Sequence, residues 1–223
     1  MKFQILFVLL FNFSTGIGQY SEVDLNVYFT DTEIKDLNTI TDFFQSEICG
    51  TKDREKFGKC VRNLVPDISE LGGNFIERTI RYRKQKKLYN QISKSTFQKV
   101  WHVCKTVMVD QKYEFERLCF SGNSKFKNFV LELGKTSGYL SRYGQTLELG
   151  NMGNTNFIAS NIVDFPKSMN IENRGVQIVF AIHYLTQNDH IKRDKKVKRL
   201  EKQGLRKLQR KYNKKTVPNK IYN

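Results

Sequence analysis

The sequence contains few of the residues, and none of the short motifs, from which catalytic sites are usually recognised. Its 223 residues include three histidines, His102, His183 and His190. It has no H-E-x-x-H, G-x-S-x-G, phosphate-binding loop or glycine-rich dinucleotide-binding motif. Nucleophilic and metal-assisted catalysis therefore have no support beyond scattered residues.

One class of enzyme needs no short motif, because glycoside hydrolysis requires only two carboxylates at a suitable separation. We consider Glu47 as its acid, with Glu70 or Glu77 as a second carboxylate, although a solvated helix end explains Glu47 more simply. His102 and His183 complete the catalytic candidates. His183 lies within an apolar segment, where a single histidine is more often a hydrogen-bonded core residue.

Long apolar runs are also missing. After the N-terminal segment, no stretch approaches the ~20 apolar residues that cross a bilayer, so we expect no transmembrane helix in the mature chain. Residues 1–18 combine Lys2, an apolar run and small residues before Gln19, which is the pattern of a cleaved secretory signal peptide. An uncleaved anchor is the alternative. The pattern predicts a secreted or periplasmic protein.

The four cysteines include no C-x-x-C pair, and no pair of histidines lies near them. We therefore expect neither a metal ion nor any other cofactor. An even number of cysteines in an exported chain favours two disulfides, for which three pairings exist. Our interpretation is the local one, Cys49 with Cys60 and Cys104 with Cys119, and free buried thiols are the alternative.

Positive charge is concentrated at one end of the chain. Residues 191–223 contain fourteen lysines or arginines and two acidic residues, a net charge of +12 out of +16 for the whole chain. Val197, Leu200, Leu208 and Tyr212 in this tail follow one helical stripe. A basic amphipathic helix suits an anionic lipid, a glycan or another polyanion, or a groove of an unknown protein partner. A solvated tail without a ligand is the alternative.

The residues of the tail that we expect to contact a polyanion are its central lysines and arginines. They are Lys195, Lys196, Lys198, Arg199, Lys202, Arg206, Lys207, Arg210 and Lys211. Nucleic acid ranks below lipids and glycans as the partner, because an exported protein rarely meets it and the tail has few aromatic residues for base stacking. Residues 78–87 form a second basic run, read either as an anion-binding patch or as a solvated helix face.

The pattern of apolar residues predicts an all-α fold, with one helical domain at 19–190 and the basic tail at 191–223. About five or six helices would surround a buried helix near 175–189, where the residues are apolar on every side. A T-x-x-E capping box at Thr30 and Glu33 begins the first helix, which should end near Glu47.

Further helices are expected over 68–92, 95–109 and 124–143, with Pro66 marking the start of the first of these. Residues 113–120 are expected to continue the helical pattern less clearly, and residues 154–165 form a weaker amphipathic segment. Residues 23–29 alternate like a short strand or an extended lead-in.

The leading hypothesis is an exported, non-enzymatic helical domain that binds an anionic surface or polyanion through its basic tail. A cell-envelope or cell-wall hydrolase with paired carboxylates is one alternative. A secreted signalling bundle is another, since small secreted bundles also carry basic tails.

Overall fold

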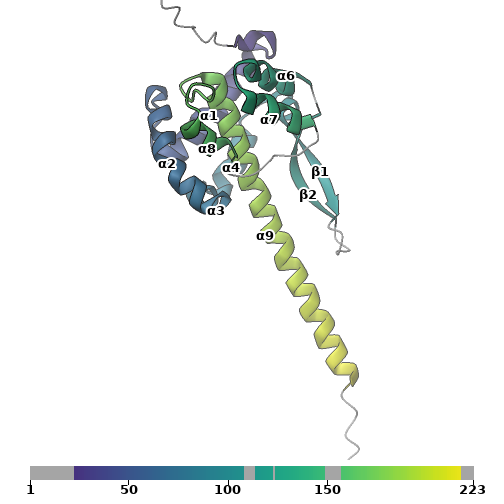
Figure 1. Ribbon diagram of the computed structural model, residues 1–223. Coiled ribbons are helices and arrows are strands. Elements are labelled where there is room, and N and C mark those ends of the chain that lie inside the picture. The colour runs from purple at the N-terminus through teal and green to yellow at the C-terminus, as the bar shows by residue number, and fades with distance from the viewer. Residues whose placement is uncertain (1–22, 108–113, 123, 149–156, 217–223) are drawn as a thin grey trace, which may run out of the picture.

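A computed structural model describes residues 23–107, 114–122, 124–148 and 157–216 (Figure 1). The predicted signal peptide lies outside these residues. The described residues form nine α-helices and one two-stranded hairpin, which confirms the all-α class. None of the described helices has the length and apolar character needed to cross a membrane.

The first α-helix, α1, spans Asp31–Cys49 and begins as predicted. The Thr30 side chain accepts from the backbone N–H of Glu33, and the Glu33 carboxylate accepts from the N–H of Thr30. Gly50 ends the helix with φ of 67°, a left-handed conformation that glycine adopts without strain. The short strand considered over residues 23–29 is wrong, because Leu25–Val27 within it form the 3-10 helix η1.

The long helix predicted over 68–92 is instead divided. After the short helix η2, Arg54–Lys56, come α2, Phe57–Leu71; α3, Gly73–Thr79; and α4, Tyr82–Tyr89. Gly72 allows the first break because its φ is positive, at 56°. Pro66 lies inside α2 rather than at a helix start; one face of α2 buries four large apolar residues, which outweighs the lost backbone hydrogen bond.

The helix predicted over 95–109 is wrong beyond Val100. Helix α5 covers Lys94–Val100, and strand β1, Trp101–Val107, then pairs antiparallel with β2, Glu114–Phe120. Aromatic and β-branched residues favour the strands, and the Cys104–Cys119 disulfide joins them. The predicted continuation of helix over 113–120 is wrong for the same reason. Trp101 is fully buried and its indole N–H donates to Thr186, so its predicted place in the core is confirmed.

The helix predicted over 124–143 is interrupted at Gly134. It comprises α6, Ser124–Leu133; the 3-10 helix η3, Gly134–Thr136; and α7, Gly138–Glu148. A side chain at Gly134 would place its Cβ 2.5 Å from the backbone nitrogen of Ser141, so glycine allows the turn to close. The weaker segment contains α8, Phe157–Asp164.

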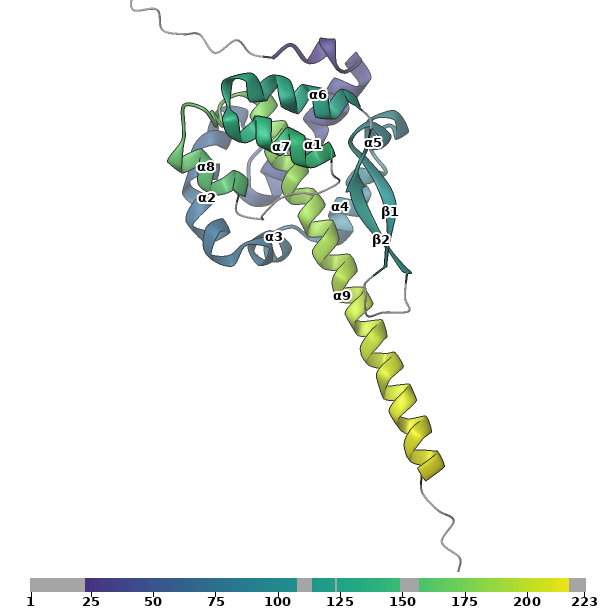
Figure 2. The same ribbon diagram turned by 45° about the vertical axis from the view of Figure 1, so that its right-hand side comes forward.

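The last helix, α9, spans Arg174–Thr216, and helices α1, α3, α4 and α6 and strand β2 pack against it. We call the packed part of the protein the body. Every residue from Gly175 to Asp189 is buried, as predicted for a central helix. Figures 1 and 2 show α9 running through the body and continuing far beyond it as a single helix. The basic tail is therefore not a separate helix but the outer half of the core helix.

Candidate polyanion-binding surface

Buried polar contacts fix the inner half of α9 where it approaches the surface of the body. The side-chain amide of Asn188 donates to Gln85 of α4 and to the backbone carbonyl of Ile80. Asp189 is fully buried; its carboxylate accepts from the guanidinium of Arg193 at 2.5 Å and from the hydroxyl of Tyr82 at 2.8 Å. These directional contacts hold the helix against α4.

Three elements contact the next turns of α9 through hydrogen bonds and ion pairs. The residues that make these contacts are Glu77 of α3, Tyr82 of α4, and Arg117 and Leu118 of β2. We call these four residues the exit collar, because α9 leaves the body between them.

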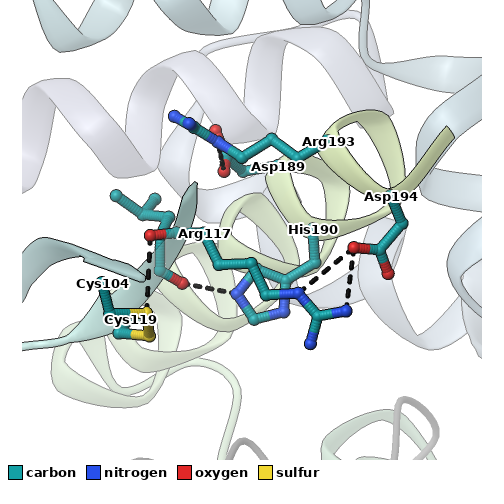
Figure 3. Close-up of a disulfide and its surroundings, with 8 residues drawn as sticks. Cys104, Arg117, Cys119, Asp189, His190, Arg193 and Asp194 are labelled. Atoms are coloured by element: carbon teal, nitrogen blue, oxygen red, sulfur yellow. Dashed lines mark hydrogen bonds and ion pairs between the residues drawn. A yellow bond between two sulfur atoms is a disulfide. The ribbon is translucent and has the colours of Figure 1, made fainter. Parts of the chain in front are cut away.

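On one side of the exit collar, Glu77 binds Lys192 at 2.7 Å and also pairs with Lys195. On another side, the N–H of His190 donates to the carbonyl of Leu118, and Arg117 pairs with Asp194 (Figure 3).

The ionisation of the collar residues supports these contacts. Hydrogen bonds from Lys192 and Lys195 lower the pKa of Glu77, so it is ionised at neutral pH. Burial and then the Asp189 carboxylate raise the pKa of Tyr82 to about 12, which keeps its hydroxyl a donor. Burial opposes the charge on Arg193, but pairing with Asp189 outweighs it and raises the pKa of Arg193.

Beyond the exit collar, residues 195–216 form what we call the projecting half of α9. It is roughly 30 Å long at 1.5 Å per residue. Eight of the nine predicted polyanion-binding cations are exposed there: Lys195, Lys196, Lys198, Arg199, Lys202, Arg206, Lys207 and Arg210. The side chain of Lys211 lies outside the described part of the chain. Of the eight, only Lys195 has an acidic partner among the described side chains.

The cations of the projecting half are spaced so that they repel one another. Lys195 and Arg199 are four residues apart, as are Lys198 and Lys202. Arg206 extends this series, lying four residues after Lys202 and four before Arg210. Like charges at this spacing destabilise a helix by roughly 0.2–0.5 kcal/mol per pair. A bound anion would relieve that repulsion.

A groove of about 480 Å³ lies between α3 and the base of the projecting half. Its charged lining residues are Glu77, Lys192, Lys195, Lys196 and Arg199, and Leu200 and Gln203 complete it. Four cations against one carboxylate give this concave surface a net positive charge. All four cations belong to α9, and Glu77 of α3 already pairs with Lys192 and Lys195.

The second basic run lies mostly on α4 and faces solvent. Arg83, Lys86 and Lys87 are exposed, and Lys84 pairs with Glu47 at 2.7 Å. The ammonium of Lys86 also lies 5.5 Å from the ring centroid of Tyr82, a cation–π contact. This run therefore differs from the projecting half, because it lies flat on the body and two of its cations already have partners.

The structure does not bring together the catalytic candidates Glu47, His102 and His183. Glu47 lines a groove of about 450 Å³ that contains no histidine, and its carboxylate is paired with Lys84. His102 is exposed on β1, not at the edge of a helical core face, because the expected helix is a strand. His183 is fully buried, with Nδ1 3.0 Å from the Tyr143 hydroxyl and Nε2 2.8 Å from the Gln187 amide.

The carboxylates considered as partners of Glu47 also lie apart from it. Glu77 belongs to the exit collar, and the low pKa of its side chain is the opposite of what a general acid needs. Glu70 is exposed on α2.

Both predicted disulfides are confirmed, as Cys49–Cys60 and Cys104–Cys119. The ligand atoms of His102, Cys104 and Cys119 lie within 4.8 Å of one another. A metal would need the thiolates of both cysteines, and the disulfide occupies both sulfur atoms. In its oxidised form the cluster therefore offers one imidazole.

The sequence predicted a polyanion-binding role for the cations of the projecting half, which stays a prediction, and it gave no indication of the exit collar. Glu77 was considered only as a catalytic partner, and neither Arg117 nor Tyr82 was expected to contact α9. Because residues 113–120 were expected to be helical, no feature of the sequence indicated a contact between strand β2 and α9.

Comparison of the chain with models of protein families, with curated proteins and with solved structures finds no match.

Proposed function

We propose that this protein is an exported, non-enzymatic binding domain that attaches to a polyanion, such as an anionic lipid, a surface glycan or another extracellular polymer, through the projecting half of α9. One observation carries the proposal. Seven exposed cations without an acidic partner among the described side chains stand on a helix that the exit collar anchors to the body. A polyanion bound along this helix would offset the repulsion between its cations.

The test compares two variants that each lose three positive charges. K202Q/R206Q/R210Q removes them from the projecting half, and R83Q/K86Q/K87Q removes them from α4. Glutamine keeps the helix propensity of lysine and arginine. With inorganic polyphosphate as the probe at low salt, we expect the α9 variant to bind at least roughly tenfold more weakly, and the α4 variant to bind within about threefold of the unmodified protein.

Salt dependence gives a second readout. Each lost phosphate contact should reduce the slope of log K against log salt by roughly 0.7–0.9, so the α9 variant, which loses three cations, should lose about two to three units of slope. Equal losses in both variants would mean that net charge alone drives binding, and the proposal would be wrong.

A further inference from the structure

The projecting half of α9 exposes apolar side chains that binding by charge alone does not need. Leu200 is 52% exposed and Leu205 is 68% exposed. A soluble polyanion is held by lysine and arginine, with no apolar contribution required. These two leucines therefore favour a ligand that has an apolar part as well as negative charge.

The apolar and charged residues are arranged around the projecting half as in a helix that lies in a bilayer surface. By helical spacing, Leu200 and Gly204 lie on the same side of α9 as Val197, which is buried at 8% exposure, and Leu205 lies at the edge of this side, next to the position of Glu201. The cations on the opposite face are Lys195, Arg199, Lys202, Arg206 and Arg210.

The three remaining exposed cations flank the apolar face, with Lys198 beside Leu205 on one boundary and Lys196 and Lys207 on the other. Helical spacing places Lys196 and Lys207 beside Leu200, on the boundary between the two faces, and both are exposed. At a bilayer surface, a lysine in this position lays its hydrocarbon stem along the apolar layer and extends its ammonium to the headgroups.

We infer that the ligand of the projecting half is the surface of an anionic lipid bilayer, on which the helix lies with Leu200 and Leu205 inserted among the lipids. This inference rests on the proposed function, since the same cations supply the attraction to the headgroups. A second copy of the chain is a poor occupant of this face, because two helices with the same dense positive charge repel each other.

The exit collar determines which way the apolar face points. His190 and Asp194, which contact β2, precede Val197 by seven and three residues and lie on the same side of α9. The hairpin therefore packs along the inner continuation of the apolar face, as its position beside α9 in Figure 2 illustrates. The side of the body that carries the hairpin is the side turned toward the bilayer.

The test separates the contribution of leucine insertion into the bilayer from the contribution of the cations. L200Q/L205Q keeps every charge of the projecting half, and V163Q/F165Q is its control, since Val163 and Phe165 of the body are 50% and 46% exposed. The probes are vesicles of phosphatidylcholine with phosphatidylserine, vesicles of phosphatidylcholine alone, and inorganic polyphosphate. We expect L200Q/L205Q to bind the anionic vesicles at least tenfold more weakly, about 1.4 kcal/mol, with polyphosphate binding unchanged. V163Q/F165Q should behave as the unmodified protein with both probes.

A single substitution reports insertion directly. In Leu200→Trp the new indole should shift its emission to the blue on anionic vesicles and not on polyphosphate, while the buried Trp101 provides a constant background. If L200Q/L205Q binds the vesicles as tightly as the unmodified protein, or if the unmodified protein binds polyphosphate but no vesicle, the lipid inference is wrong and the proposed function stands. Failure to bind either probe would overturn both.

Discussion

Arg117 of β2 and Asp194 of α9 form an ion pair where α9 leaves the body, with Nη2 2.9 Å from Oδ1. Arg117 lies two residues before Cys119, whose disulfide to Cys104 ties β2 to β1 (Figure 3). The direction of the projecting half is thus coupled to the hairpin and its disulfide.

Removal of the Cys104–Cys119 disulfide should loosen that coupling. With a sequence separation of 15 between the cysteines, C104S/C119S should cost about 3 kcal/mol of unfolding free energy, measured by urea denaturation. Amide hydrogen exchange over residues 190–198 should also become faster. The control C49S/C60S removes a disulfide with a separation of 11 and should lower stability without this local effect. Equally fast exchange in both variants would contradict the coupling.

Glu77 should weaken polyanion binding, because its carboxylate forms ion pairs with two lysines of α9. In Glu77→Gln, Lys192 and Lys195 lose their carboxylate partner and become available to a ligand. We expect binding to anionic vesicles to strengthen roughly two- to tenfold, since a lysine near such a surface contributes about 1 kcal/mol and both lysines lie at the base of the projecting half rather than along it. Vesicle co-sedimentation measures this. Weaker binding would show that the collar matters more than the freed charges.

The buried pair of Asp189 and Arg193 should be sensitive to loss of its cation. Arg193→Gln leaves the fully buried Asp189 carboxylate with the Tyr82 hydroxyl alone, and we expect a loss of roughly 3–5 kcal/mol in unfolding free energy. Asp189→Asn removes the buried charge itself, and Arg193 is exposed enough to reach water, so this variant should cost less. A larger loss for Asp189→Asn would contradict this order.

Acid should weaken the junction between α1 and α5 through Glu33. Burial alone would raise the pKa of Glu33, but hydrogen bonds from Lys99, Ser95 and Thr30 outweigh it and lower the pKa to about 2. A carboxylate with a lowered folded-state pKa stabilises the fold above its unfolded value of 4.5, and this contribution is lost as pH falls from about 5 to 2. Urea unfolding should therefore show a steeper decline over this range for the unmodified protein than for Glu33→Gln. Parallel curves would be evidence against this role.

The sequence predicted those elements whose signals are local. The capping box at Thr30 and Glu33 placed the start of α1, and apolar residues on all sides identified the buried helix near 175–189. Both rest on residues within a few turns of each other, where periodicity and capping act.

The elements that were missed depend on contacts between distant parts of the chain. Residues 101–107 were predicted as helix because Trp101, Cys104 and Val107 continue the helical spacing of Phe97 and Val100, and only pairing with β2 makes them a strand. The exit collar likewise joins Glu77 to Lys192 and Arg117 to Asp194 across 115 and 77 residues. Contacts between such distant residues produce no periodic pattern in the amino-acid sequence.

The most direct measurement of the central claim is the binding of anionic vesicles by a chain that ends at Val197. This shortened chain keeps every contact of the exit collar, all of which involve residues up to Lys195, and loses the exposed cations and leucines beyond it. At roughly 0.05 M salt we predict that the full chain binds and the shortened chain does not, and that roughly 0.5 M salt weakens the binding of the full chain. Vesicle binding by the shortened chain as tight as that of the full chain would contradict the account.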